Sequence, residues 1–305
     1  MSDQDRPAQP RVGVVGLGAM GLGMARSLRK AGYQVGVHDL RPEVAEGFAR
    51  DGGTAFASPG DLAATVDVVV GVVVDAAQVE SVLFGADVAA ARLRPGAVFV
   101  MCSTVDPGWS AELGERLAER GVLYLDAPIS GGAARAAAGE LTMMTSGPAA
   151  AYAVADPVLE AMSATVYRLG EQPGLGSKVK IVNQLLAGVH IAAAAEAMAL
   201  GLKAGVPAEA LYEVITHSAG NSWMFENRMA HVLAGDYTAL SAVDIFVKDL
   251  GLVLDSARPE RFPLPLAATA HQMFLQASAS GLGAEDDSAV IKIFPGIDLP
   301  RPMGA

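Results

Sequence analysis

The stretch "RVGVVGLGAMGLGMARSLRKAGYQVGVHD", residues 11–39, decides the fold of the first half of the chain. The short apolar run Arg11–Val15 predicts a strand, and the apolar spacing of Met20–Lys30 predicts a helix that stops at Gly32. A second β-branched run over Val35–His38 predicts another strand. A strand, a glycine turn, a helix and a strand in this order are typical of a parallel β-α-β unit.

The glycine turn in this unit has the spacing G-x-G-x-x-G, formed by Gly16, Gly18 and Gly21. The triplet alone is a weak signal, because GLG recurs elsewhere in the chain, but here it follows a strand and opens a helix. Such glycines let the backbone approach a pyrophosphate at the start of the helix. The alternative is a tight turn without a ligand. The predicted NAD-binding residues of this unit are Gly16, Leu17, Gly18, Ala19, Met20, Gly21 and Asp39.

Asp39 ends the second strand and predicts which cofactor is used. A carboxylate there accepts hydrogen bonds from the ribose hydroxyls and repels the 2′-phosphate of NADP, so we expect NAD. Arg41, two residues on, would soften that preference if it reached the same site. We interpret it as a solvated loop cation.

Strands and helices alternate up to about residue 170, and only helices are predicted from Ser177 onward. The further strands predicted are Val66–Val74, Val98–Cys102 and Val122–Asp126. The helices predicted between them are Ala76–Phe84 and Ser110–Arg120. This alternation predicts an α/β Rossmann domain, a doubly wound parallel sheet, followed by an all-α domain joined through a long helix. The expected divisions are a flexible tail over 1–10, an NAD-binding domain over 11–173 and a helical domain over 174–305.

Composition limits the possible partners and the compartment. The chain has 305 residues and a net charge of −11, which disfavours nucleic acid and anionic membranes. Cys102 is the only cysteine. We therefore expect no disulfide within the chain and no cysteine metal cluster. A single cysteine also favours a reducing, cytoplasmic location. The five histidines have no ligand spacing, so we predict no metal site. The apolar run 185–202 contains His190 and Glu196, which favours a buried helix over a membrane span.

A second glycine turn, "DAPISGG" over 126–132, follows the strand that ends at Asp126. Two glycines expose backbone N–H groups and Ser130 adds a hydroxyl, a combination that can hold a carboxylate. A plain glycine turn is the alternative from these residues alone. The residues of this predicted substrate site are Ser130, Gly131 and Gly132.

Lys180 and Asn183 lie three residues apart in "GLGSKVKIVNQ", so they share one helix face. Most lysines at a helix start are solvated. The helix that follows is apolar all round, however, which predicts burial and places this lysine at the mouth of a cleft. Burial favours the neutral amine, which suits it to proton transfer.

The segments "GLGAMG", "DAPISGG", "GLGSKVKIVNQ" and "KDLGL" resemble the four signature segments of the 3-hydroxyisobutyrate dehydrogenase-related (β-hydroxyacid dehydrogenase) family, along essentially the whole chain. Longer stretches, such as "AGNSWMFENRM" and "EDDSAVIKIF", are similar to a branch that oxidises the 2-hydroxyl of a four-carbon sugar acid. The resemblance implies an NAD-dependent dehydrogenase that forms homodimers or homotetramers through its helical parts.

The resemblance also implies roles for single residues. Lys180 matches the catalytic general acid and base, and Asn183 the asparagine that positions a small anionic substrate. Val73, Val74, Thr104 and Lys248 match residues near the cofactor. The family commonly has Leu-Pro where this chain has Val73-Val74, a departure shared by similar sequences of the sugar-acid branch. Two alternatives stay open: a dehydrogenase of another short hydroxyacid (3-hydroxyisobutyrate or tartronate semialdehyde type), or a non-catalytic dinucleotide sensor, which Lys180 disfavours.

Two further polar clusters have open interpretations. The stretch 217–228 supplies Asn221, Ser222 and Trp223, which either line the pocket or belong to the core or a subunit contact. In "EDDSAV", Asp286, Asp287 and Ser288 are explained by helix capping.

Overall fold

The computed structural model describes residues 9–87 and 89–301. The chain divides into two compact units, Met1–Lys180 and Ile181–Ala305, and each is described by itself. The boundary between them falls inside one long helix, α9 (Leu175–Lys203). The tail predicted over residues 1–10 lies outside the described residues except for its last two positions.

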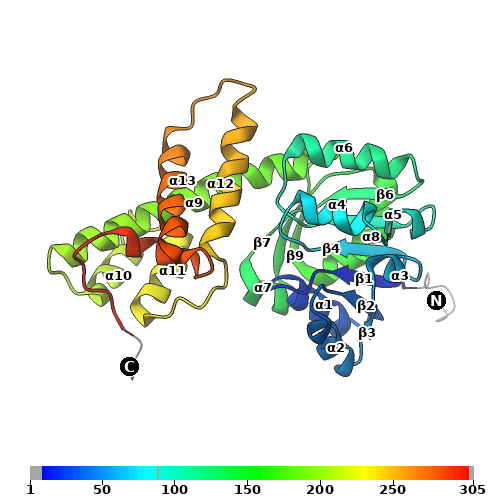
Figure 1. Cartoon of the computed structure of the whole chain (residues 1–305), viewed down its shortest axis with the longest axis horizontal. Coiled ribbons are helices and arrows are strands. Elements are labelled where there is room, and N and C mark those ends of the chain that lie inside the picture. Colours follow the sequence, from blue (N-terminus) through cyan, green and yellow to red (C-terminus); the bar gives the residue numbers. More distant parts are fainter. Residues whose placement is uncertain (1–8, 88, 302–305) are drawn as a thin grey trace. The chain divides into compact units, whose positions relative to one another are not determined.

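The first unit is built on a six-stranded sheet with the order β3-β2-β1-β4-β5-β6 (Figure 1). Its strands are β1 (Val12–Val15), β2 (Val35–His38), β3 (Thr54–Ala55), β4 (Val68–Gly71), β5 (Val98–Met101) and β6 (Leu123–Asp126). All neighbouring strands are parallel. The strand order reverses between β1 and β4, and this reversal is where doubly wound sheets bind ligands. The predicted Rossmann sheet is confirmed.

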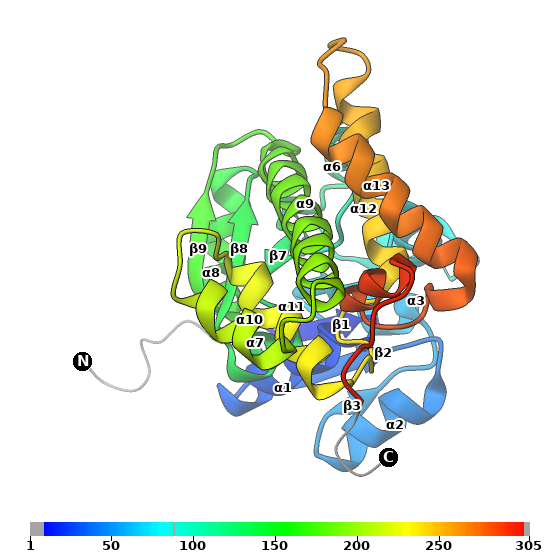
Figure 2. The same cartoon turned by 90° about the vertical axis from the view of Figure 1, so that its left-hand side faces the viewer.

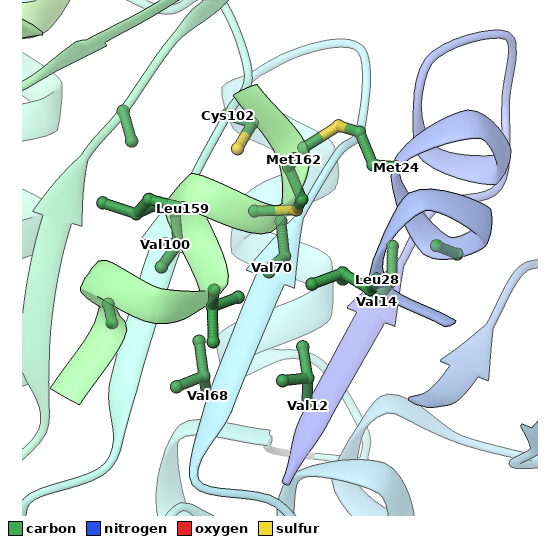
Figure 3. Packing of buried hydrophobic residues seen from close by; sticks show 14 of the residues in the cluster. Val12, Val14, Met24, Leu28, Val68, Val70, Val100, Cys102, Leu159 and Met162 are labelled. Carbon is green, nitrogen blue, oxygen red and sulfur yellow. The ribbon is translucent and has the colours of Figure 1, made fainter. Parts of the chain in front are cut away.

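Helices cover both faces of this sheet, because alternate strand residues point to opposite sides. Val70 and Val100 belong to a buried cluster with Met24, whereas Val69 and Phe99 belong to a separate cluster. Figure 3 shows the first cluster packed beneath α1 and α8. The helices of this unit are α1 (Gly21–Lys30), α2 (Pro42–Arg50), α3 (Pro59–Ala63), α4 (Ala76–Phe84), α5 (Ala89–Arg92), α6 (Pro107–Ala118), α7 (Gly132–Ala138) and α8 (Ala149–Met162).

A small second sheet in this unit was not predicted. Its strands are β7 (Ile129–Ser130), β8 (Leu141–Thr145) and β9 (Ser163–Arg168). β7 is antiparallel to β8, and β8 is parallel to β9. Sequence pattern misses β9 because most of its side chains are exposed or half-buried, and it misses β7 because its two residues lie inside a glycine turn.

The second unit is helical in its described residues, as predicted. After α9 follow α10 (Ala208–Thr216), α11 (Trp223–Ala234), α12 (Val243–Ala257), α13 (Pro265–Ala277), the π-helical turn η2 (Ser278–Leu282) and the 3-10 helix η3 (Asp287–Ile293). α12 and α13 pack side by side (Figures 1 and 2). Phe246 and Phe274 stack between these two helices, with ring centroids 5.2 Å apart.

The helix α9 has only one buried face. Ile191 and Met198 are fully buried in the core of the second unit, whereas Val182, Leu186 and Leu200 are 60%, 51% and 71% exposed. The prediction of a helix buried all round is therefore wrong for the single chain. By length and hydropathy α9 could cross a membrane, but 44% of its most apolar stretch is buried inside the protein.

Candidate active site

The predicted cofactor residues of the first unit gather at one edge of the six-stranded sheet. Gly16 follows β1, Asp39 follows β2, Val73 follows β4 and Thr104 follows β5. Carboxyl ends of parallel strands meet at a single edge, so four segments distant in the sequence converge there. The convergence is direct at Gly16, whose N–H donates to the backbone oxygen of His38 at 2.9 Å.

The glycine turn has the shape that a pyrophosphate requires. Gly16 has φ +92, and a Cβ there would lie 2.3 Å from the backbone oxygen of Val72. A Cβ on Gly21 would lie 1.9 Å from the oxygen of Gly16, whereas one on Gly18 would meet nothing within 4 Å. The first and third glycines therefore close the turn, and the second leaves its outer side open.

The helix that follows this turn, α1, has no side chain that satisfies the free N–H groups at its start. α1 has no side-chain cap at Met20 and no acidic residue in its first turn. An uncapped helix start attracts an anion through its N–H groups and its dipole. The residues present thus fit the pyrophosphate of a dinucleotide. The side chain of Leu17 is buried in the core, so only its backbone is available to a ligand.

Asp39 is held by its own chain. Its Oδ2 accepts from the N–H of Leu17 at 2.6 Å, and its Oδ1 accepts from the N–H and Nε of Arg41 at 2.9 and 3.0 Å. Burial raises the pKa of Asp39, but the hydrogen bonds from Arg41 and Leu17 outweigh it, so the pKa lies below its ordinary value. The interpretation of Arg41 as a merely solvated cation is therefore wrong, because its guanidinium forms an ion pair with Asp39.

The loop after β4 leads into α4 through Asp75. Val74 is exposed, and its N–H donates to Gln78 Oε1 at 2.9 Å. Asp75 caps α4 by accepting from the N–H of Gln78 at 2.8 Å. This cap fixes the loop that carries Val73 and Val74 beside the glycine turn, and the Cβ position of Gly16 lies 3.1 Å from Val73.

The second glycine turn joins the small sheet to α7. Ser130 is the last residue of β7, and Gly131 and Gly132 follow with φ +137 and +78. Both glycines occupy conformations that other residues rarely adopt. Nothing lies within 4 Å of a Cβ built on Gly132, so the backbone here faces open space.

Lys180 is connected to this same turn. Its side chain is only 7% exposed, and its Nζ donates to the backbone oxygen of Ile129 at 2.8 Å. Ile129 immediately precedes Ser130. The predicted proton-transfer group therefore lies beside the predicted carboxylate-binding turn, within the first unit.

A buried carboxylate holds the start of α9, and sequence reasoning missed it. Asp126 Oδ2 accepts from the N–H groups of Gly174 and Ser177 at 2.9 and 2.8 Å. Its Oδ1 accepts from Ser177 Oγ at 2.7 Å, and Ser146 Oγ adds a bond to Oδ2 at 3.3 Å. Burial raises the pKa of Asp126, and the bonds from Ser177 partly lower it. Asp126 lies in the motif DAPISGG and Ser177 in GLGSKVKIVNQ, but nothing in the sequence indicates that the two residues pair.

Asn183 and Lys248 lie in the second unit. Asn183 Nδ2 donates to Gln184 Oε1 at 3.0 Å, and Gln184 Nε2 donates to Asp249 Oδ2 at 2.6 Å. Lys248 Nζ lies 2.7 Å from Asp249 Oδ1. Both predicted residues therefore belong to one polar group, in which hydrogen bonds link Asn183 to Asp249 through Gln184 and an ion pair links Asp249 to Lys248. Gln184 and Asp249 were not predicted.

The polar residues of the stretches 217–228 and 285–290 make mainly structural contacts. Ser222 caps α11 by accepting from the N–H of Phe225 at 3.0 Å, and Asn221 Nδ2 donates to Glu226 at 2.6 Å. Trp223 is exposed. Asp286 caps η3, as expected, by accepting from Ser288.

Asp287 forms an ion pair that its expected capping role did not include. It is fully buried, and it pairs with Arg228, whose Nη2 donates to Asp287 Oδ2 at 3.0 Å. The pairing links α11 to the start of η3. The capping interpretation covered the local contacts but missed this ion pair.

Known protein families match both halves of the chain. Residues 11–170 match the NAD binding domain of 6-phosphogluconate dehydrogenase. Residues 174–294 match the model described as NAD-binding of NADP-dependent 3-hydroxyisobutyrate dehydrogenase.

Individual relatives cover nearly the full length. An L-threonate dehydrogenase of Cupriavidus necator is 66% identical over 95% of this chain and 97% of its own. One of Escherichia coli K12 is 53% identical over 95% of this chain and 96% of its own. A crystal structure titled 3-hydroxyisobutyrate dehydrogenase, from Salmonella typhimurium, superposes with a TM-score of 0.89 at 54% identity, covering 93% of this chain and 99% of that one.

Proposed function

The chain belongs to the 3-hydroxyisobutyrate dehydrogenase family, and we propose that within it the protein oxidises the 2-hydroxyl of L-threonate to 2-dehydro-L-erythronate. It is an oxidoreductase with an NAD-binding first unit. Support for the substrate comes from the two curated relatives reported above, which are both L-threonate dehydrogenases matched over almost their whole length.

The single observation that carries the mechanism is the contact between Lys180 and Ile129. A hydrogen bond of 2.8 Å from Nζ to the Ile129 oxygen holds the amine one residue from Ser130. An α-hydroxy acid has its carboxylate and its reacting hydroxyl on adjacent carbons. A carboxylate bound by Ser130, Gly131 and Gly132 therefore places that hydroxyl within reach of the lysine.

The residues then have separate tasks. The N–H groups of the glycine turn and the Ser130 hydroxyl bind the carboxylate. Neutral Lys180 takes the proton of the 2-hydroxyl, and Asn183 helps to position the substrate through another of its hydroxyls. Bound NAD supplies the acceptor for the hydride that leaves the carbon as the C=O bond forms. In the reverse direction the Lys180 ammonium returns the proton to the carbonyl oxygen.

We propose that the cofactor is held by backbone at Gly16–Gly21 and by the Asp39 carboxylate at the ribose. Val73, Val74, Thr104 and Lys248 complete the proposed set. The uncapped start of α1 supports the pyrophosphate position. The Asp39–Arg41 pair supports ionised Asp39, the form that accepts hydrogen bonds from ribose hydroxyls.

Substrate is tested by following NADH production at 340 nm over three- to six-carbon sugar acids. The competing class is represented by 3-hydroxyisobutyrate and by D-glycerate, the alcohol whose oxidation gives tartronate semialdehyde. We expect L-threonate to have the highest kcat/KM. A carboxylic acid that lacks the extra hydroxyls leaves polar groups of the pocket unpaired, at about 1–3 kcal/mol each. A panel led by 3-hydroxyisobutyrate would transfer the assignment to that substrate, and no turnover with any acid would favour a dinucleotide sensor.

We further propose that the exposed face of α9 packs against a second copy of the chain, in a homodimer or homotetramer. Val182, Leu186, Ala193 and Leu200 lie along this helix and are all exposed. Such a row of apolar side chains is typical of a helix seam between subunits. Light scattering of Leu186→Lys should show a smaller species than the wild type, whereas Leu266→Lys, at an exposed leucine of α13, should not. Equal masses for all three would contradict the proposed face.

We propose that the protein is cytoplasmic. The one cysteine, Cys102, is buried, and burial together with the Asp126 charge raises the pKa of its thiol. The net charge of −11 disfavours nucleic acid and anionic lipid as partners. The proposed ligand, a small anionic acid, is repelled by the same net charge, so it must be held by local groups, here the donors of Ser130, Gly131 and Gly132. Cell fractionation tests the location, and enrichment in the membrane fraction would contradict it.

A further inference from the structure

A buried chain of polar groups in the second unit ends at Asn183. Asp249 on α12 is 2% exposed, and Gln184 on α9 is also buried. Gln184 Nε2 donates to Asp249 Oδ2 at 2.6 Å, and Asn183 Nδ2 donates to Gln184 Oε1 at 3.0 Å. The other Asp249 oxygen lies 2.7 Å from Lys248 Nζ. These groups therefore link a proposed substrate residue to a proposed cofactor residue.

The direction of this chain follows from the carboxylate. An ionised Asp249 only accepts hydrogen bonds, so Gln184 must turn its NH2 group toward it. The carbonyl oxygen of Gln184 then faces Asn183 and needs a donor. Asn183 must present its NH2 group to Gln184, and its own carbonyl oxygen points elsewhere. One charge thus fixes the orientation of two successive amides.

We propose that Asp249 and Gln184 are positioning residues that hold the Asn183 amide with its carbonyl oxygen outward, as an acceptor for a substrate hydroxyl. The inference rests on the proposed function, because L-threonate carries hydroxyls besides the reacting one and 3-hydroxyisobutyrate does not. We call the hydrogen-bonded series Asp249–Gln184–Asn183 the relay. Without it the Asn183 amide turns freely and presents its NH2 group as readily as its carbonyl oxygen, which weakens selection for a substrate hydroxyl that donates.

Close packing keeps the relay in register. α9 approaches α12 at Gly188, where a Cβ would lie 2.9 Å from the Leu250 side chain. Gly188 is one turn after Gln184, and Leu250 follows Asp249. The missing side chain at Gly188 therefore lets the two helices come close enough for the glutamine to reach the carboxylate.

The kinetic test replaces the middle of the relay. Gln184→Met keeps the length of the side chain and removes both hydrogen bonds. We expect kcat/KM for L-threonate to fall about tenfold, the value of one well-made hydrogen bond. For 3-hydroxyisobutyrate we expect a change below about twofold, and NAD affinity should stay unchanged. The matched control, Gln272→Met at an exposed glutamine of α13, should match the wild type with both acids. An equal fall for both acids in Gln184→Met would overturn the proposal, because that is the result of a purely structural role.

A thermal test needs no substrate and uses Asn183→Asp and Asp249→Asn. In the double variant the relay can run backward: the new amide at position 249 donates to Gln184, and Gln184 donates to the new carboxylate at position 183. The double variant should therefore melt higher than the sum of the single shifts predicts. Effects of Asn183→Asp on Lys180, and of Asp249→Asn on Lys248, cancel in the double-mutant cycle. Strict additivity would overturn the relay.

The same cycle in the Gln184→Met background separates the relay from direct repulsion between two carboxylates. Coupling through the amide disappears there, whereas repulsion between positions 183 and 249 persists. Undiminished coupling would contradict the proposal. A wild-type enzyme inactive on L-threonate would reject the proposed function, and this thermal cycle would still decide whether the relay exists.

Discussion

Lys180 donates a hydrogen bond from Nζ to the backbone oxygen of Ile129 at 2.8 Å, although the two residues are 51 positions apart. The contact joins the first turns of α9 to the strand β7. It sets the amine next to Ser130, where we propose that the substrate carboxylate binds. A neutral amine can donate to this carbonyl and still accept a proton, so the contact orients the base without consuming it.

Asp39 should determine the choice between NAD and NADP. In Asp39→Ala the Arg41 guanidinium loses its partner, and the carboxylate no longer repels a 2′-phosphate. NAD affinity should fall about tenfold or more, because hydrogen bonds to a charged group are worth about 1.5–3 kcal/mol. The ratio of kcat/KM with NADP to that with NAD should rise. The control is Arg41→Ala, which keeps the carboxylate and should keep the NAD preference. An unchanged ratio in Asp39→Ala would exclude a role for Asp39 in this choice.

Asp126 should hold the start of α9 in place. Asp126→Ala leaves the buried N–H groups of Gly174 and Ser177 unpaired, each at a cost of about 1–3 kcal/mol. Urea unfolding should show this loss in the free energy of unfolding. The milder Ser177→Ala removes only the hydroxyl bond and should lose about 0.5–1.5 kcal/mol. Because Lys180 is one turn further along the same helix, kcat should fall in both variants. Wild-type stability in Asp126→Ala would contradict this account.

Asp287 should make stability depend on pH between about 4 and 6. Burial raises the pKa of Asp287 to about 6, from 3.8, although Arg228 acts in the opposite direction. In this pH window the folded protein holds a proton that the unfolded chain has released. The free energy of unfolding therefore falls as pH rises, by up to about 3 kcal/mol from this group.

The measurement is the free energy of unfolding against pH for the wild type and Asp287→Asn. The variant cannot titrate at this position, so the difference between the two curves should change across the window. Asp286 and His231 remain in both proteins and interact with Asp287, so the difference between the curves reports the titration of Asp287 together with its coupling to these two groups. A constant difference from pH 4 to 6 would show that Asp287 does not titrate there.

The first β-α-β unit was predictable because each of its features is local. Strand runs, the G-x-G-x-x-G turn and the helix after it lie within residues 11–39, and the structure has all of them in the expected order. The family, the NAD-binding domain and the helical second half are likewise confirmed. The assigned roles of the site residues stay predictions until the variants are measured.

Other features depend on contacts between distant segments. The pairing of Asp126 with Ser177 spans 51 positions, and that of Gln184 with Asp249 spans 65. No periodicity or spacing rule links such residues before the chain is folded. The prediction that α9 is buried all round failed for a different reason. An apolar helix side has the same composition whether it packs in the core or against another subunit.

Whether Lys180 moves the proton is decided by kcat of Lys180→Ala, measured beside NAD affinity. General acid–base groups contribute about 10²–10⁴-fold, so kcat should fall at least that far while NAD still binds, because the Gly16–Gly21 turn is untouched. Lys180→Arg should fail as well, since a guanidinium does not release its proton near neutral pH. The matched control is Lys178→Ala, an exposed lysine two residues earlier on the same helix, which should keep normal turnover. A near-normal kcat in Lys180→Ala would contradict the account and leave Lys180 as a structural link between α9 and Ile129.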